Sequence, residues 1–370
     1  MHIVIDLLIA EKKPGGMLFS TRALLEGLAR VDHANDYTII TTHPQEYQAL
    51  AQNMQICPVM LPSQRAILIQ HQLAVPDILR RLRPDVLHVP TFAAPIGWHG
   101  PLVLTIHDLG FLTSPDQSSF YTRLYWQYLL RESVRRAHSL IAVSEQTRTE
   151  LMHHWSVEQE RIHLIHNALR PSLASVEMAA EDVLATRQRY GGKYLLHVGR
   201  IIPRKNVEKL IEAFDLLAAR FVDLQLVLAG GSGFGSEIVQ QQIANSPHHA
   251  RIHQVGWISD NDLRLLYAGA SALVFPSRHE GFGLPTLEAM TCGIPVVASP
   301  EAASMEIAGN AVLRADCSST SLLADALVQV LTDTSLRTRL ISQGQAQALS
   351  FTCEACALAT LEVYQKAAHP

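Results

Sequence analysis

The chain has 370 residues, of which 48% are hydrophobic and 17% are charged. This composition excludes a disordered or fibrous chain, and a length above about 250 to 300 residues predicts two domains. With 30 Lys and Arg against 34 Asp and Glu, the formal net charge is −4. The chain as a whole therefore has no electrostatic preference for nucleic acid.

No apolar run reaches the roughly 18 residues that span a bilayer, and the sequence starts directly on a short strand pattern. We therefore expect a cytoplasmic protein. The five cysteines are odd in number and scattered, which disfavours a disulfide framework. Cys353 and Cys356 form an isolated C-x-x-C, for which helix packing is favoured over metal or redox chemistry.

The first half alternates strand-like apolar runs with helical periodicity, which predicts a mostly parallel sheet. Gly15 and Gly16 close a loop between the first strand and the first helix. Paired glycines let a backbone approach a ligand closely, although two glycines alone favour a plain tight turn. Strands are predicted at 2–7, 37–40, 85–88, 102–106, 140–143 and 162–165.

The strand at 102–106 ends in His107 and Asp108. A histidine at the carboxyl end of a sheet strand lies where such sheets bind ligands, but an isolated histidine is more often structural than catalytic. The site role of His107 therefore stays open on this pattern alone.

A helix predicted at 120–138 combines aromatic and basic side chains. It either contacts a membrane surface or an anionic acceptor, or it packs its aromatic side chains inward with its arginines in solvent. The second arrangement is the more common one. The residues concerned are Tyr121, Arg123, Tyr125, Trp126, Tyr128, Arg131, Arg135 and Arg136.

The periodicity is lost between Asn167 and Pro171, which places a domain boundary there. The second half then restarts the alternation of strands and helices. Strands are predicted at 194–198, 225–229, 272–276 and 295–298, and helices at 180–189, from 206 to about 220, and at 259–269, 319–332, 334–349 and 353–366.

The loop after the strand at 194–198 carries Arg200, Arg204 and Lys205 ahead of a helix. An arginine can fork two oxygens and a lysine is a mobile point charge, so Arg200 and Lys205 suit a diphosphate. Arg204 is best explained as solvated. In the glycine-rich run at 230–235 the third glycine comes too early for a dinucleotide-binding fingerprint, and we expect a flexible turn near a nucleotide.

The stretch from Ser277 to Ser299 concentrates the chemistry of the chain, with Pro285 at the start of a helix. Glu280 falls in the preceding loop and Glu288 about one turn into the helix, so both are expected to face the mouth above the strand ends. The helix N-terminus offers a positive dipole end and free N–H groups to a phosphate. Carboxylates for hydroxyls beside such a helix start predict a nucleotide sugar, although either carboxylate alone is explained as a complement to the helix dipole.

Together these segments resemble the retaining glycosyltransferases of the GT-B fold, family 4, over nearly the whole chain. The motifs are Gly15-Gly16, T-I-H-D at 105–108, V-S-E at 143–145, G-R-x-x-x-x-K-N at 199–206 and E-G-F-G-L-P-T-L-E at 280–288, followed by C-G-I-P-V-V-A-S. The sequence departs from the family at Cys353, where an aromatic residue is common, and at Asn167-Ala168, where Asn-Gly is more usual. Residues 45–103, which would shape the acceptor side, match no motif that we can interpret.

The resemblance implies an α/β protein of the GT-B fold, with two Rossmann-like domains whose parallel sheets face a central cleft. The N-terminal, acceptor-side domain would span residues 1–170, with the C-terminal helix at 353–370 crossing back to it. The C-terminal, donor-side domain would span residues 171–352. A site divided in this way would require the domains to close for catalysis.

The resemblance also implies roles for individual residues. Arg200 and Lys205 would neutralise the leaving diphosphate, and Glu288 would accept hydrogen bonds from the ribose. Glu280 would accept them from the donor sugar, with His107 near the reacting carbon. Backbone groups that assist donor binding would come from Gly15, Gly16, Phe282, Gly283 and Leu284. No metal and no cofactor is implied, because the cations and the helix dipole act where other enzymes use a divalent ion.

The expected function is transfer of a hexose from a nucleoside-diphosphate sugar, of the GDP-mannose or UDP-glucose type, to a hydroxyl of a sugar, glycan or lipid-linked acceptor. A same-face reaction is favoured over a double displacement on Glu280, since a carboxylate that binds sugar hydroxyls is poorly placed to attack the anomeric carbon. The alternatives are a GT-B nucleotide-sugar epimerase or phosphorylase, or a non-catalytic nucleotide-sugar-binding subunit. No nucleic-acid partner is expected, and the helix at 120–138 leaves a peripheral contact with the inner face of a membrane open.

Overall fold

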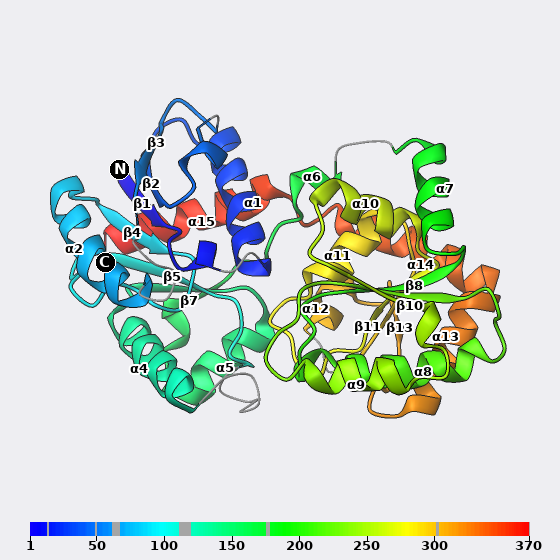
Figure 1. Cartoon of the computed structure of the whole chain (residues 1–370). Coiled ribbons are helices and arrows are strands. Elements are labelled where there is room, and N and C mark those ends of the chain that lie inside the picture. The colour runs from blue at the N-terminus through cyan, green and yellow to red at the C-terminus, as the bar shows by residue number, and fades with distance from the viewer. Residues whose placement is uncertain are drawn as a thin grey trace. The chain divides into compact units, whose positions relative to one another are not determined.

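The computed structural model describes residues 1–12, 15–48, 50–60, 67–110, 120–174, 178–300 and 303–369 (Figure 1). These residues divide into two compact units, each built on its own sheet. Among the described residues, the first unit comprises those up to Arg170 together with those from Phe351 onward, and the second comprises Pro171–Ser350. None of the described helices is long and apolar enough to cross a membrane.

The first unit contains a seven-stranded sheet in the order β3-β2-β1-β4-β5-β6-β7, with every pair parallel. Its strands are β1 (His2–Asp6), β2 (Asp36–Thr41), β3 (Met54–Pro58), β4 (Val86–Val89), β5 (Leu102–Ile106), β6 (Ser139–Ala142) and β7 (Ile162–Leu164). Its main helices are α1 (Gly16–Val31), α2 (Ile67–Leu82), α4 (Phe120–Arg136), α5 (Glu145–Trp155) and α15 (Cys353–Ala368).

Both faces of this sheet are buried, because successive side chains of a strand point to opposite faces. Ile3 and Ile5 of β1 belong to a core cluster with α1 and α15. Val4, between them, belongs to a second cluster with α2, α4 and α5. The continuous apolar runs that predicted these strands follow from this two-sided burial.

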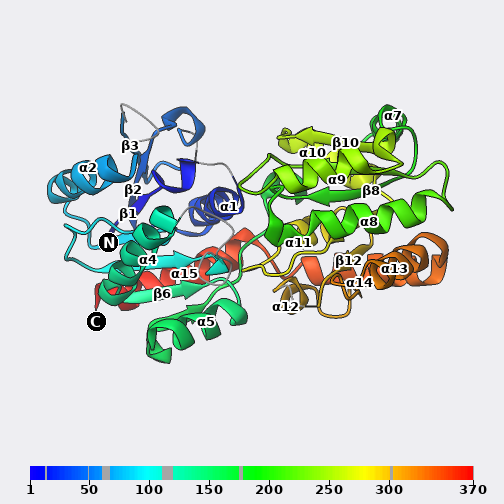
Figure 2. The ribbon, with the colours of Figure 1, turned by 60° about the horizontal axis from the view of Figure 1, so that its bottom comes forward.

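Helix α15 returns to the first unit and lies beside α1 (Figures 1 and 2). The two helices approach so closely that a Cβ on Gly27 would lie 2.1 Å from the carbonyl oxygen of Cys353. Cys353 and Cys356 are both free thiols, and Cys353 packs against Ala23 and Ala168. The C-x-x-C pair therefore contributes to helix packing.

The second unit contains a six-stranded sheet in the order β10-β9-β8-β11-β12-β13, also parallel throughout. Its strands are β8 (Tyr194–Val198), β9 (Gln225–Ala229), β10 (Ile252–Gly256), β11 (Ala272–Phe275), β12 (Val296–Ala298) and β13 (Leu313–Arg314). Its helices are α6 (Pro171–Ala174), α7 (Ala180–Arg189), α8 (Val207–Ala218), α9 (Glu237–Asn245), α10 (Asp260–Gly269), α11 (Leu284–Thr291), α12 (Ser304–Ala308), α13 (Thr320–Thr332) and α14 (Thr334–Ala348).

Two Rossmann-like units with parallel sheets confirm the predicted α/β fold class. In each sheet the strand order reverses once, between β1 and β4 in the first and between β8 and β11 in the second. Open parallel sheets bind ligands outside the carboxyl ends of the strands at such a reversal. The loops that follow these strands are therefore where a site is sought.

Candidate active site

Two loops leave neighbouring strands at the carboxyl edge of the second sheet. Strands β8 and β11 pair directly, with Leu195 opposite Ala272 and Leu196 opposite Leu273. The loop at 199–206 follows β8, and the loop at 276–283 follows β11. Because parallel strands end at the same edge, the predicted cations and Glu280 are brought to one place.

Glu280 is the centre of this cluster. Its Oε1 accepts a hydrogen bond from Lys205 Nζ at 2.6 Å and lies 3.2 Å from Arg204 Nη1. Glu280 is 7% exposed and Lys205 is 8% exposed. Burial alone would raise the pKa of this carboxyl, but Arg204 and Lys205 outweigh it and lower the pKa from 4.5 to about 2. Glu280 is thus an ionised hydrogen-bond acceptor.

The expectation that Arg204 is solvated is wrong. Its side chain is only 10% exposed, and its guanidinium donates to the carbonyl of His279. Its own carbonyl accepts from Arg278 N at 2.9 Å. The loop after β11 folds over the turn at Pro203–Lys205, which draws Arg204 into the cluster. The sequence could have indicated this role for Arg204 through its position directly before Lys205.

Lys205 is held from several sides. Its ammonium lies 4.8 Å from the centroid of the Phe275 ring, and a Cβ on Gly199 would meet its Cε at 3.4 Å. Asn206 then adopts a left-handed φ of 57°, and α8 begins at the next residue. Its side-chain amide donates to the carbonyl of Cys317 at 2.8 Å. The left-handed residue turns the chain into α8 directly after Lys205, since asparagine tolerates this conformation better than most residues.

Arg200 lies on the same loop, but its side chain is exposed. Its Nη2 would be 3.2 Å from a Cβ on Gly233, so the guanidinium lies beside the glycine run at 230–235. That run is tied to the loop: Ile201 N donates to Gly231 O, and Gly233 N donates to Ile201 O, both at 3.0 Å. The backbone passes so close at Gly230 that a Cβ there would lie 2.0 Å from Gly199 O.

Glu288 is buried on α11, the helix that follows the second loop. Its Oε2 accepts a hydrogen bond from Tyr267 Oη at 2.7 Å. Gly283 precedes the helix with a left-handed φ of 95°, and Leu284 and Pro285 form its first turn. The predicted donor-binding residues Phe282, Gly283 and Leu284 therefore lie at the helix start, as expected from their sequence.

His197 was not singled out from the sequence. It lies on β8 and is fully buried, and its Nδ1 lies 3.1 Å from the carbonyl oxygen of Val274. Burial and the charge of Lys205 lower its pKa to about 4 against the opposing effect of Glu280, so the ring is neutral at pH 7. Among the described residues, its Nε2 has no hydrogen-bond partner. The only sign of this residue in the sequence was a histidine within an otherwise apolar strand.

The remaining predicted residues belong to the first unit. Gly15 precedes α1 with an extended φ of 173°, and Gly16 is the first residue of the helix. His107 directly follows β5. Burial lowers its pKa to about 4, against the effects of Asp108 and the Pro90 carbonyl, and its Nε2 is buried without a partner among the described residues.

His88, on the neighbouring strand β4, shows what a structural histidine looks like here. Its two ring nitrogens bind Tyr364 Oη at 2.7 Å and Thr105 Oγ1 at 2.9 Å. Its hydrogen-bonding capacity is therefore fully used inside the core. His107 differs because its Nε2 has no such partner within the described part of the chain.

Helix α4 corresponds to the predicted basic and aromatic helix. Trp126 packs edge-on against Phe92, with ring centroids 4.8 Å apart, whereas Tyr128 is 59% exposed. Arg136 Nη1 donates to three backbone carbonyls, with distances of 2.8 to 3.1 Å. The side chains of Tyr121, Arg123 and Tyr125 lie outside the described residues. Of the described aromatic side chains of α4, Trp126 thus packs inward and Tyr128 lies at the surface.

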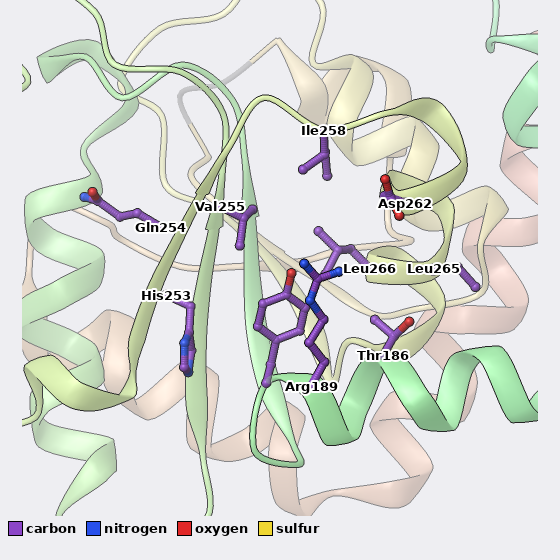
Figure 3. A pocket seen from close by; sticks show the side chains of 10 residues that line it. Thr186, Arg189, His253, Gln254, Val255, Ile258, Asp262, Leu265 and Leu266 are labelled. Atoms are coloured by element: carbon purple, nitrogen blue, oxygen red, sulfur yellow. The ribbon is translucent and has the colours of Figure 1, made fainter.

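A cavity of about 540 Å³ lies in the second unit beside the edge strand β10 (Figure 3). Helices α7 and α10 supply its other walls, through Thr186, Arg189 and Asp262 among others. On its wall the rings of Tyr190 and His253 pack edge-on, with centroids 5.6 Å apart. None of the predicted site residues lines this cavity.

Comparison with known proteins identifies the family. The model for Glycosyltransferase Family 4 matches residues 14–173, and the model for Glycosyl transferases group 1 matches residues 185–347. The O-antigen chain mannosyltransferase B of Escherichia coli is 28% identical over 369 residues, which cover 99% of this chain and 94% of that protein.

Two further similarities cover part or all of the chain. The O-antigen chain mannosyltransferase RfbU of Salmonella typhimurium is 28% identical over 210 residues, or 57% of this chain and 55% of that protein. The crystal structure of Anabaena HepE in complex with UDP and glucose has a TM-score of 0.78 at 20% identity, covering 99% of both chains. With a family model on each unit and this fold, the chain belongs to the family 4 glycosyltransferases of the GT-B fold.

Proposed function

We propose that this glycosyltransferase moves a hexose from a nucleoside-diphosphate sugar to a hydroxyl of a growing glycan, with retention of anomeric configuration and without a metal ion. The observation that carries the proposal is the cluster of Lys205, Arg204 and Glu280 at the carboxyl edge of β8 and β11. In this proposal the ionised Glu280 accepts hydrogen bonds from sugar hydroxyls, and the cations beside it bind a diphosphate.

In this proposal Lys205 and Arg200 bind the oxygens of the donor diphosphate. The bond between the anomeric carbon and the phosphate oxygen breaks, and the diphosphate leaves with the electron pair. The two cations stabilise the charge that develops on it, which lowers the barrier directly. Lys205 then serves two partners, since its ammonium carries three donors and Glu280 uses one of them.

The acceptor hydroxyl attacks from the face that the diphosphate leaves. Its oxygen forms the new bond to the anomeric carbon, and its proton passes to the departing phosphate oxygen. No dedicated protein base is needed for this same-face route. Glu280 is proposed to bind the hydroxyls of the donor sugar, and Glu288 to bind the ribose. The hydrogen bond from Tyr267 fixes the orientation of the Glu288 side chain.

A mannosyl donor is favoured by the relatives, of which two are named as O-antigen chain mannosyltransferases. A glucosyl donor is the alternative, since the structurally similar HepE was crystallised with UDP and glucose. Thermal-shift titration with GDP, UDP and ADP distinguishes them, because a ligand that binds only the folded state raises the melting temperature. Transfer assays with GDP-mannose and UDP-glucose then identify the sugar.

Three results test the chemistry. We expect full activity after treatment with EDTA, and an NMR spectrum of the product with the anomeric configuration of the donor. An inverted product or a strict requirement for a divalent ion contradicts the proposal. A glycosyl adduct on Glu280, detected by mass spectrometry, replaces the same-face route with a double displacement.

The relatives' names favour transfer over the epimerase, phosphorylase and non-catalytic alternatives. Each alternative also predicts its own result. An epimerase isomerises the donor without an acceptor, a phosphorylase releases a sugar phosphate from a glycan and phosphate, and a binding subunit leaves the donor intact under all conditions.

A further inference from the structure

A basic cavity of about 540 Å³ lies in the first unit, away from the residues of the proposed reaction. It is formed by the C-terminal part of α4, the end of α5 and the short turn at Gln159–Arg161. Three of its lining side chains are arginines, Arg131, Arg135 and Arg161, and Trp155 adds an aromatic ring. The other lining residues are Val134, His154, Ser156 and Val157.

Arg161 is anchored so that part of its guanidinium stays available. Its Nη2 donates to the carbonyl of Val134 at 2.8 Å and also to that of Ala137. Its Nε and Nη1 make no hydrogen bond within the described part of the chain. The guanidinium is therefore held in place by α4 while two of its donor groups are unused.

The other two arginines add to this capacity. Arg131 is exposed and forms no hydrogen bond or ion pair with the residues that the structure describes. Arg135 binds Glu132 through Nε and Nη2, at 3.2 and 3.0 Å, which leaves its Nη1. Glu132, which binds Arg135, does not line the cavity, and none of the residues that do is acidic.

Two of the remaining polar side chains, Trp155 and Ser156, also offer donors. The indole N–H of Trp155 and the hydroxyl of Ser156 have no hydrogen-bond partner among the described residues. Cations at a helix C-terminus also complement the helix dipole, and Arg161 does so at the end of α4. That role requires neither a cavity nor an unpaired Arg131 beside it.

We propose that this cavity binds a phosphoryl group. Guanidinium groups match phosphate geometry through paired N–H donors, and several arginines can share the oxygens of one phosphate. A carboxylate offers only two oxygens to the same three arginines. The phosphate belongs either to a soluble phosphate ester or to the headgroup of an anionic lipid, and both present the same oxyanion. The inference does not depend on the proposed reaction.

The indole of Trp155 provides a local probe. In protein with ¹⁵N-labelled tryptophan, the Trp155→Phe variant assigns its indole resonance. Titration with inorganic phosphate at low salt should shift this resonance saturably, and added salt should weaken the effect. Phosphate bound at the donor site does not interfere, because the signal reports this cavity alone.

The double variant Arg131→Ala/Arg135→Ala should bind phosphate at least about tenfold more weakly, since it loses charge-assisted hydrogen bonds. Both side chains are exposed, so folding should be preserved, and a melting curve checks this. Arg81→Ala is the matched control: it removes a positive charge from an exposed arginine on α2 that forms no hydrogen bond or ion pair with the first unit's described residues. The control should bind phosphate like the unchanged protein.

Sedimentation with vesicles distinguishes the two sources of phosphate. Binding to phosphatidylglycerol but not phosphatidylcholine vesicles, reduced by phosphate and lost in the double variant, identifies the lipid headgroup. A Trp155 shift with phosphate but no sedimentation identifies a soluble ester. The proposal is overturned if phosphate leaves the Trp155 resonance unchanged, or if the double variant and Arg81→Ala behave alike.

Discussion

Lys205 and Glu280 are 75 positions apart in the sequence, yet Lys205 Nζ lies 2.6 Å from Glu280 Oε1. Both side chains are about nine-tenths buried. Breaking a buried ion pair leaves an uncompensated charge, which usually costs more than the pair itself contributes to stability. The pair thus holds together the two loops that carry the proposed donor site.

We expect Lys205→Ala and Glu280→Gln each to lower turnover by about two orders of magnitude or more, the scale seen when one preorganised charged group is removed from an active site. Steady-state rates at saturating donor measure the effect. Lys209→Ala serves as a control, because Lys209 lies on α8 outside the cluster, where it binds Glu212 at 2.7 Å and Thr320 Oγ1 at 3.5 Å. Near-normal turnover in both site variants would contradict the proposed roles.

His107→Ala should also lower turnover by about two orders of magnitude if its ring contacts the reacting sugar. The ring is neutral at pH 7, since burial lowers its pKa to about 4, and a neutral ring can accept or donate a hydrogen bond. His33→Ala, an exposed histidine at the end of α1, is the comparison. Equal rates in the two variants would return His107 to a structural role.

The Glu280 carboxyl should make stability depend on pH between about 4.5 and about 2. Its pKa is lowered from 4.5 to about 2 in the folded state, so the unfolded chain takes up the proton first as the pH falls. The stabilisation is complete above pH 4.5 and is lost towards pH 2, at no more than about 1.4 kcal/mol per pH unit for one proton.

Denaturant unfolding at pH 7, 5, 4 and 3 measures this dependence. Glu280→Gln removes the titrating group and should flatten the curve below pH 4.5. Lys205→Ala should raise the folded-state pKa of Glu280, because Arg204 is then its only close cation among the described residues. The loss of stability should therefore end at a higher pH and be smaller. Identical curves for all three proteins would show that the ion pair does not affect the carboxyl.

Tyr267→Phe tests the support of Glu288. The hydroxyl of Tyr267 donates to Glu288 Oε2 at 2.7 Å, and both residues are buried. Its loss should destabilise the protein by about 1 to 3 kcal/mol, the cost of a buried acceptor that loses a donor. If Glu288 binds the ribose, KM for the donor should also rise several-fold with a smaller change in kcat. An unchanged KM would separate Glu288 from donor binding.

Gly230→Ala and Gly231→Ala form a matched pair. A Cβ on Gly230 would lie 2.0 Å from Gly199 O, where φ is +146°, whereas a Cβ on Gly231 would meet nothing within 4 Å. We expect Gly230→Ala to lower the unfolding free energy by more than about 2 kcal/mol through overpacking and backbone strain, and Gly231→Ala to be nearly neutral. Comparable melting temperatures for the two variants would mean that the loops are not this close.

Much of the fold follows from local patterns. The predicted strands at 194–198 and 225–229 coincide with β8 and β9, and the predicted helix at 180–189 coincides with α7. Central parallel strands are buried on both faces and appear as unbroken apolar runs. Strands β3, β10 and β13 were not predicted. All three are edge strands with partly exposed residues, and their apolar signal is weak.

The resemblance to family 4, which the family models confirm, rests on short motifs whose spacing the chain preserves. It names Glu280, Glu288, Arg200 and Lys205 as site residues without showing what each one touches. Their roles in the reaction stay predictions until the variants are measured.

Contacts between distant segments could not be predicted in this way. Arg204 was expected in solvent but lies against Glu280, and His197 is buried on β8 with Lys205 close enough to lower its pKa. Both results depend on β8 and β11 being neighbours, and strand order is set by packing across the whole sheet. The same holds for the arginines of the basic cavity, which α4 and the turn at Gln159–Arg161 bring together only when the chain is folded.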